Sequence, residues 1–422
     1  MALALTGLRV WDGQSPSRSQ PEWTIRIEDG RIEAIGPEAE LAHNAKGIPL
    51  SGGTALPGLI DAHIHLTLDP ALRDPSDQLA VPPAELVPAM ESRARRMVCA
   101  GITTARDLGG GQWLELEVRD RILRRETPGP RLLCAGQPLT SSGGHCHFWG
   151  GEVGEPADIE TVIQRQLDRG ADWIKVMATG GVMTKGTNPL EPQFEQVTLD
   201  EIVRRAGASH RAVAAHCHGT VGIDRAARAG VRTIEHCSFA GSKGFGSDFD
   251  PAVLEQIASR KGQLWVSPTV NAGWGRRLER DGGMTGFGQQ MQRVLRGLDR
   301  AGVPMIASTD AGIPGVEHHR LPEALVVMAR LAGLSPHAVL RAATSESARA
   351  LGIADLTGTL EPGRSADVLV VAGNPLEDLT LLQRPRLVVA RGEVVFASQS
   401  AAGLRSSSTD SSPGTPTRSG KP

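Results

Sequence analysis

Gly58-Leu59-Ile60-Asp61-Ala62-His63-Ile64-His65 places two histidines at the end of an apolar run. Residues at positions i and i+2 of a β-strand point to the same side, so both imidazoles can reach one metal ion. The alternative is a solvated strand face with two polar residues, which the apolar flank disfavours. The stretch therefore predicts a buried strand whose C-terminal end carries a pair of metal ligands.

The chain beyond this stretch alternates short apolar runs, such as residues 173–177 and 304–308, with longer amphipathic segments. Three helix starts are marked: Thr198-Leu199-Asp200-Glu201 fits a capping box, and Asp250-Pro251 and Ser335-Pro336 place a capping residue before proline. Strand followed by helix, repeated, is typical of parallel β-structure built from βα units. The α/β class is therefore predicted, with residues 58–354 as a (β/α)₈ barrel.

Both ends of the chain have the pattern of short strands closed by turns. Asp12-Gly13, Asp29-Gly30 and Gly36-Pro37 close three runs near the N-terminus, and strand-like runs return at residues 367–371 and 386–390. We expect residues 1–57 and 355–397 to form a small β-sandwich domain beside the barrel. Residues 398–422 are rich in Ser, Thr, Pro and Gly, which predicts a disordered tail.

Lys175 lies in the middle of the apolar run at residues 173–177. A charged amine is costly in such a place, so burial would favour the neutral form. A neutral amine can react with carbon dioxide, and the resulting carbamate can bridge two metal ions. A snorkelling or ion-paired lysine is the alternative.

Three more apolar runs end in candidate ligands. His216-Cys217-His218 again places two histidines on one strand face, and its spacing does not fit a zinc finger. His236 follows Thr233-Ile234-Glu235, where a structural histidine is the alternative. Asp310 precedes Ala311-Gly312, where a helix N-cap is the alternative. The C-terminal ends of barrel strands form the active-site mouth, so these side chains are expected to converge. Imidazole and carboxylate ligands suit zinc and similar divalent ions.

The order His-x-His, lysine, histidine, histidine, aspartate resembles the amidohydrolase superfamily with a binuclear metal centre. The resemblance covers about residues 1–397, including Pro57-Gly58-Leu59-Ile60-Asp61 and Gly358-Thr359-Leu360-Glu361-Pro362-Gly363-Arg364-Ser365-Ala366-Asp367. Lys175-Val176-Met177-Ala178-Thr179-Gly180-Gly181 and Ala215-His216-Cys217-His218-Gly219 look most like the imidazolonepropionase-related branch. That branch includes Xaa-Pro dipeptidases and ochratoxin-type amidases.

The resemblance implies a hydrolase with two divalent metal ions, with zinc expected, and a bridging hydroxide that attacks a C–N amide bond. The implied metal ligands are His63, His65 and Asp310 on the first ion, His216 and His236 on the second, and carboxylated Lys175 between them. Asp310 would act as general base and then acid, and His218 would contact the substrate carbonyl or its oxyanion. His145 matches the family's substrate-side histidine, whereas His147 is left open between a supporting and a surface position.

A dipeptide or an N-acyl amino acid is the substrate expected from this branch. Its carboxylate needs a cationic partner, for which His145, Lys185 and Arg320 are the candidates. Each of them is also compatible with a solvated surface charge. Alternative substrates are a lactam, a lactone, an imidazolone ring or a bulky aromatic amide. A mononuclear deaminase would leave Lys175 without a role, and a non-catalytic scaffold would predict missing ligands.

Composition limits the remaining possibilities. The chain has 422 residues, a formal net charge of −2 and no tyrosine, so a catalytic phenol is excluded and neither nucleic acid nor an anionic membrane is an expected partner. No membrane span, no signal peptide and five cysteines together predict a cytoplasmic protein with reduced thiols. A small-molecule amide substrate is expected, and a homo-oligomer is compatible with the sequence. Glycines 241, 244 and 246 do not predict a rigid pocket wall after His236.

Overall fold

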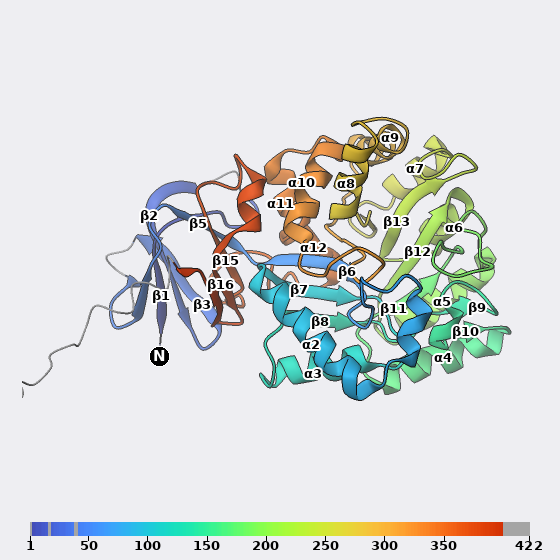
Figure 1. The fold of residues 1–422 in the computed structure, drawn as a ribbon, viewed down its shortest axis with the longest axis horizontal. Helices are drawn as coiled ribbons and strands as arrows, with labels where there is room; N and C mark the ends of the chain where they lie inside the picture. The colour runs from blue at the N-terminus through green and yellow to red at the C-terminus, as the bar shows by residue number, and fades with distance from the viewer. Residues whose placement is uncertain (1, 16–17, 38–40, 400–422) are drawn as a thin grey trace, which may run out of the picture.

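The computed structural model describes residues 2–15, 18–37 and 41–399. The predicted disordered tail lies outside these ranges from residue 400 onward. An eight-stranded sheet stands beside a larger body of parallel strands and helices (Figure 1). Among the helices of the described ranges, none has the length and hydropathy that crossing a membrane requires.

The eight-stranded sheet is built from both ends of the chain. Its order is β17-β16-β15-β5-β1-β2-β3, and β4 pairs with β1. The two ends meet where β5 runs antiparallel to β15, with Leu56 opposite Leu369. Pairing between the two terminal strand groups was expected, and it forms one continuous sheet. The strands are β1 Leu3–Val10, β2 Arg18–Glu28, β3 Arg31–Pro37, β4 Lys46–Pro49, β5 Gly53–Pro57, β15 Val368–Ala372, β16 Pro385–Ala390 and β17 Glu393–Ala397.

The parallel strands form two further sheets, ordered β6-β7-β8 and β11-β12-β13-β14, and β9 and β10 form a small parallel pair. Parallel pairing brings the C-terminal ends of neighbouring strands to one edge, which is where the predicted ligands lie. The strands are β6 Leu59–Ile64, β7 Ile102–Asp107, β8 Arg131–Cys134, β9 Thr140–Ser141, β10 Glu152–Val153, β11 Ile174–Met177, β12 Val213–Gly219, β13 Thr233–Ala240 and β14 Trp265–Ser267.

The expected strand at residues 304–308 is not formed as a strand. Met305 makes one isolated bridge to Val266, and Ala307 accepts a 2.9 Å backbone hydrogen bond from Ala62. These single bonds link β14 to β6 without a continuous ladder. On the other side, Leu139 makes an isolated bridge to Val176 and donates a 2.8 Å backbone bond to the Lys175 carbonyl. The assigned parallel strands thus form two open sheets. Backbone hydrogen bonds link the two sheets at both pairs of facing edges.

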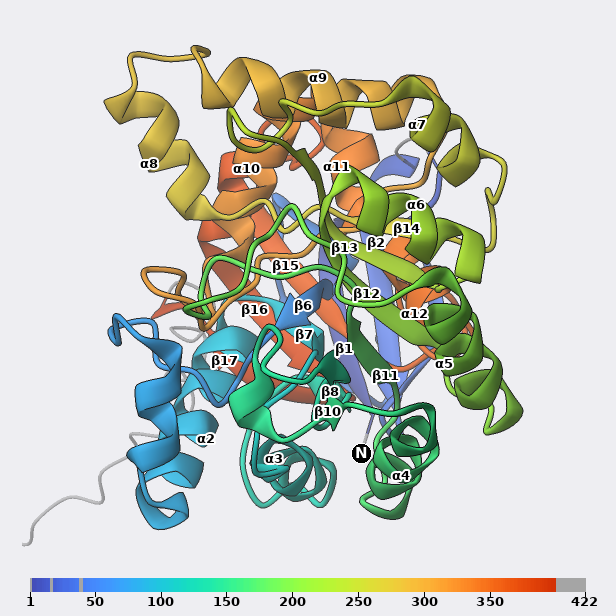
Figure 2. The ribbon, with the colours of Figure 1, turned by 90° about the vertical axis from the view of Figure 1, so that its right-hand side faces the viewer.

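Helices surround the parallel strands (Figure 2). Asp250 and Ser335 cap α7 and α11 as predicted, each accepting a backbone N–H from the first turn. The capping box predicted at Thr198 is wrong, because the carbonyl of Glu195 accepts the first helical bonds and α5 therefore begins at Gln196. The helices are η1 Pro75–Ala80, α2 Pro83–Cys99, α3 Leu114–Leu123, η2 His147–Trp149, α4 Pro156–Asp168, α5 Gln196–Ala208, α6 Thr220–Ala229, α7 Pro251–Ala258, α8 Ala272–Arg280, α9 Phe287–Arg300, α10 Leu321–Ala332, α11 Pro336–Ala342, α12 Ser345–Leu351 and η3 Leu379–Gln383.

Candidate metal centre

A cavity of about 240 Å³ lies at the C-terminal ends of the parallel strands. Its wall brings together every side chain predicted to bind metal, although they come from segments up to 247 residues apart in sequence, as His63 and Asp310 are. The predicted ligands on this wall are His63, His65, Lys175, His216, His236 and Asp310, and His145 and His218 also line it.

His63 and His65 each direct a ring nitrogen that carries no proton, Nε2, toward Asp310. Nδ1 of His63 lies 2.9 Å from a carboxylate oxygen of Glu235, and Nδ1 of His65 lies 2.8 Å from the Gly109 carbonyl. Both partners are acceptors, so in the neutral rings the protons are on Nδ1 and the Nε2 atoms are bare. Burial lowers the pKa of His63 to about 4, which keeps that ring neutral near neutral pH.

The two bare Nε2 atoms lie 3.3 Å apart, and each is 3.3 Å from Oδ1 of Asp310. Burial opposes ionisation of Asp310, but His63, His65 and Lys175 outweigh it and hold the pKa of this carboxyl below its usual value. Three lone pairs at this spacing repel one another unless a cation lies among them. Two imidazoles and a carboxylate fit a divalent ion such as zinc.

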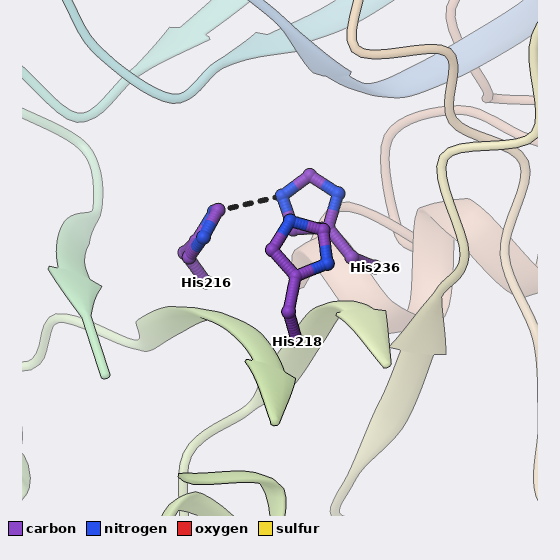
Figure 3. A group of neighbouring side chains, drawn as sticks. All are labelled: His216, His218 and His236. Atoms are coloured by element: carbon purple, nitrogen blue, oxygen red, sulfur yellow. Dashed lines mark hydrogen bonds between the residues drawn. The ribbon is translucent and has the colours of Figure 1, made fainter. Parts of the chain in front are cut away.

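A second group of ligand atoms lies on β12 and β13 (Figure 3). Nε2 of His216 lies 3.2 Å from the Gly180 carbonyl and so carries the proton, which leaves Nδ1 bare. That Nδ1 faces Nε2 of His236 at 2.9 Å. Ligand atoms of His216, His218 and His236 all lie within 4.8 Å of one another, as do those of His63, His236 and Asp310. Each group could hold a cation, and the two groups adjoin because both include His236.

Lys175 reaches this centre from β11. Its side chain is 1% exposed, and its Nζ has no hydrogen-bond partner among the described residues. Burial lowers the pKa of Lys175 to about 8, so about a tenth of the amine is neutral at pH 7. An orphaned, buried amine beside two groups of ligand atoms fits the expected carbamate.

Glu235 and Arg106 support the centre, and the sequence did not single them out. Glu235 is fully buried, accepts from Nδ1 of His63 at 2.9 Å and pairs with Nη2 of Arg106 at 2.8 Å. Burial opposes ionisation of Glu235, but Arg106 and His63 outweigh it and hold its pKa below the usual value. The pair therefore fixes the His63 ring with Nε2 toward the cavity. The alternation of side chains along a strand was the available sequence signal for Glu235, because it places this residue on the opposite strand face from the apolar Ile234.

Asp61 ties the His63 strand to the segment that carries Asp310. Its carboxyl accepts from the backbone N–H and the hydroxyl of Thr309 at 3.1 and 2.6 Å. Burial raises the pKa of Asp61 to about 7.

The backbone is strained where the ligands are held. His236 has φ +64°, Asp310 has φ +59°, and Thr269, whose hydroxyl lies 2.9 Å from Nδ1 of His236, has φ +52°. Non-glycine residues adopt this left-handed region at a cost of roughly 1–2 kcal/mol each. The fold therefore holds two predicted ligands in unfavourable backbone conformations.

Aromatic side chains form much of the remaining cavity wall. Phe245 stacks on the His218 ring with centroids 4.8 Å apart and planes 6° apart, and Trp149 lies 5.3 Å from the His65 ring. The glycine-rich loop that carries Phe245 is closed by paired backbone bonds between Gly241 and Gly244 and by a 2.7 Å bond from Gly246 N–H to Ser238. The glycines permit this tight backbone bonding.

A sequence model of the amidohydrolase family matches residues 54–395. The chain belongs to the amidohydrolase family. An ochratoxinase of Aspergillus niger is 28% identical over 431 residues, which cover 92% of this chain and 84% of the relative. An imidazolonepropionase of Chloroflexus aggregans is 24% identical, covering 89% of this chain and 91% of the relative. A crystal structure of a Xaa-Pro dipeptidase with bound methionine in its active site has a TM-score of 0.81 at 26% identity, covering 93% of this chain and 99% of that one.

This amidohydrolase is a metal-dependent hydrolase, and its relatives support hydrolysis of C–N bonds. The facing lone pairs of His63, His65 and Asp310 fit a metal ion on physical grounds as well.

Among the residues predicted near the substrate of this amidohydrolase, His145 lines the cavity, whereas Lys185 and Arg320 do not. His145 lines the cavity, its Nδ1 lies 2.9 Å from the Thr184 hydroxyl, and burial lowers its pKa to about 3. Lys185 is exposed and does not line the cavity. Arg320 pairs with Glu323 at 2.5 Å and does not line it either. His147 is half-buried outside the cavity wall, with Nδ1 3.0 Å from the Gly144 carbonyl.

Proposed function

We propose that this amidohydrolase cleaves the C–N bond of a small-molecule amide that carries a bulky apolar or aromatic group. The wall of the cavity carries the proposal. Apart from the residues of the centre, it is formed mainly by apolar and aromatic side chains, and among the described residues no arginine and no lysine other than Lys175 lines it. An apolar wall favours an apolar substrate group, whereas a small charged dipeptide needs a cation beside its carboxylate. Similarity to an ochratoxinase supports an amide of this kind.

We propose two zinc ions as the cofactor, held by the residues predicted for each. His63, His65 and Asp310 would hold one ion, His216 and His236 the other, and Lys175 as its carbamate would bridge them. When bound, the ions would polarise the substrate carbonyl and lower the pKa of a water molecule. The orphaned Nζ of Lys175 and the facing lone pairs support this assignment.

The chain's own residues supply proton transfer and orientation in this proposal. Asp310 is ionised, and its Oδ1 has no hydrogen-bond donor among the described residues, so it can accept a proton from the attacking water and return it to the leaving amine. Nδ1 of His218 lies 2.9 Å from the Ser238 hydroxyl, and burial lowers the pKa of His218 to about 4. If the hydroxyl donates to Nδ1, the proton of the neutral ring is on Nε2, which then donates to the developing oxyanion.

We propose that the parallel strands close into a barrel in which residues 304–307 occupy the place of the eighth strand. The bonds from Leu139 to Lys175 and from Ala62 to Ala307 support closure at the two seams. Closure explains why ligands from distant segments face one interior.

A dipeptide or N-acyl amino acid is the second candidate substrate. It is favoured by the likeness to the Xaa-Pro dipeptidase structure, at a TM-score of 0.81. Ring opening of an imidazolone is supported by the weaker similarity to imidazolonepropionase.

Amine release from matched substrates tests the proposal. N-aryl benzamides, N-acyl amino acids and dipeptides are incubated with the zinc-loaded protein in bicarbonate. We expect the apolar aryl amides to be cleaved fastest. Lys175→Ala should lose most bound zinc and activity, whereas Lys185→Ala, an exposed lysine outside the cavity, should keep both. Faster cleavage of dipeptides would establish the second candidate instead, and full activity of Lys175→Ala would refute the proposed centre.

A further inference from the structure

A second cavity adjoins the metal centre across Phe245. It has a volume of about 340 Å³ and is lined by the loop after β13 and by the facing ends of α8 and α9. Phe245 belongs to the walls of both cavities. Trp274 of the first cavity also contacts Phe287 of the second, with ring centroids 5.0 Å apart. The rings of Phe245, Trp274 and Phe287 therefore lie along the boundary between the two cavities.

This outer cavity is cationic, unlike the inner one. Lys243 and Arg277 line it, and among the described residues no acidic side chain does. The Arg277 guanidinium lies 4.0 Å from the centroid of the Phe287 ring, which fixes it over the cavity wall. Its Nε is 3.5 Å from Asp281, which neutralises part of its charge. No ion pair of the described residues involves Lys243, so its ammonium is available to a ligand.

The loop that presents Lys243 is positioned by the fold. Gly246 packs so closely on α9 that an added Cβ would lie 2.8 Å from the backbone of Gln290. The segment from β13 to α7 and the helix α9 run along the same edge of the molecule (Figure 2). The positive end of the α9 dipole, at Gly286 and Phe287, also lines the outer cavity and adds to its positive potential.

We propose that the outer cavity is a subsite for a carboxylate carried by the substrate's apolar group, remote from the scissile amide. The inference rests on the proposed hydrolysis of a bulky apolar amide. Lys243 and Arg277 would bind the carboxylate, and the rings of Phe245, Trp274 and Phe287 would contact the apolar spacer. The preferred substrate is then an aromatic amide with a distal acid. Lys185 and Arg320, predicted from sequence to bind the carboxylate of a dipeptide or N-acyl amino acid, do not line this cavity.

Paired probes test the subsite. N-benzoyl anilines carry a para substituent of increasing length that ends in a carboxylate, and each is matched by its neutral primary amide. Cleavage is measured with the zinc-loaded wild type, and binding is measured by calorimetry with the same protein and probes whose amide N–H is replaced by CH₂, which cannot be hydrolysed. At the favoured length we expect the acid to have a KM and a Kd roughly five to ten times lower than the neutral probe, with similar kcat.

The double variant K243A/R277A should abolish that preference, so that the acid and the neutral probe have equal KM and Kd. Arg280→Ala is the matched control, because Arg280 is on the same helix and approaches the same Asp281 at 3.4 Å but does not line the cavity. Equal binding of acid and neutral probes, or an equal loss in Arg280→Ala, would overturn the subsite. Cleavage without charge preference refutes the subsite alone. Charge-dependent binding without cleavage refutes the proposed function alone.

Discussion

At the scale of single residues, the centre depends on a buried ion pair that touches no substrate. Glu235 holds the His63 ring, and Arg106 compensates the charge of Glu235 while donating to the Ala62 carbonyl at 2.8 Å. Both side chains are fully buried, so neither charge can be satisfied by water. The Glu235 carboxylate therefore affects both the orientation of the His63 ring and the stability of the buried strands.

Glu235→Gln should separate these two contributions. It leaves the Arg106 charge unpaired, so the free energy of unfolding should fall by roughly 3–5 kcal/mol. Loss of the anionic acceptor on His63 should weaken zinc binding by about 10-fold to 100-fold. Urea unfolding and chelator competition measure the two effects.

The double variant R106Q/E235Q removes both charges, so it should regain stability but not zinc affinity. Glu346→Gln is the control, because Glu346 pairs with Arg341 and lies outside the metal cavity. Recovery of zinc affinity in the double variant would show that Glu235 acts only through stability.

At the scale of elements, the sequence predicts well whatever a local pattern determines. Alternation of apolar runs with amphipathic segments located the parallel strands, and strand parity placed His63 beside His65 and His216 beside His218. The patterns could not place loop residues. Lys185 and Arg320 carry the right charge, but loop geometry directs them away from the cavity. Residues 304–308 have a strand-like sequence yet make only isolated bonds, because strand assignment depends on neighbours distant in sequence.

The loop after β13 is the element whose conformation should control substrate binding. Gly246→Ala would impose a side chain at φ +78° and a clash with the Gln290 backbone, so Phe245 should leave the His218 ring. We expect KM for aryl amides to rise several-fold with a smaller change in kcat. Gly244→Ala shares a positive φ, +98°, but its added Cβ meets nothing within 4 Å. That variant should lose roughly 1 kcal/mol of stability and keep its KM. Equal KM values in the two variants would contradict a positioning role for this contact.

At the scale of the whole molecule, the fold buries many groups in uncharged form. Burial lowers the pKa of His63 and His218 to about 4 and of His145 and His318 to about 3, and it also lowers the pKa of His216 and His236. Burial raises the pKa of Asp61 to about 7 and of Glu115 to about 8, and it raises that of Asp107. The histidines and the carboxyls therefore affect stability with opposite sign.

The metal-free protein should be most stable near pH 6.5. Between about pH 4 and 6.5 the unfolded chain protonates histidines that the folded protein keeps neutral, so stability falls as the pH is lowered. The three carboxyls oppose this trend, because they stay protonated only in the folded state, but six histidines outnumber them. Each net proton contributes about 1.4 kcal/mol per pH unit.

Above about pH 7 the histidine contribution is nearly complete, while the carboxyls continue to favour the unfolded chain until they ionise near pH 7 to 8, and Lys175, with a pKa lowered to about 8, opposes them as it loses its proton. Urea unfolding of chelator-treated protein across this range measures how the free energy of unfolding changes on the acid side (the acid limb) and on the alkaline side of the maximum. Zinc binds deprotonated ligands, so the loaded protein should have a steeper acid limb than the chelated one. Identical acid limbs with and without zinc would mean that protonation of the facing histidines does not compete with metal binding, and the two-group centre would then be wrong.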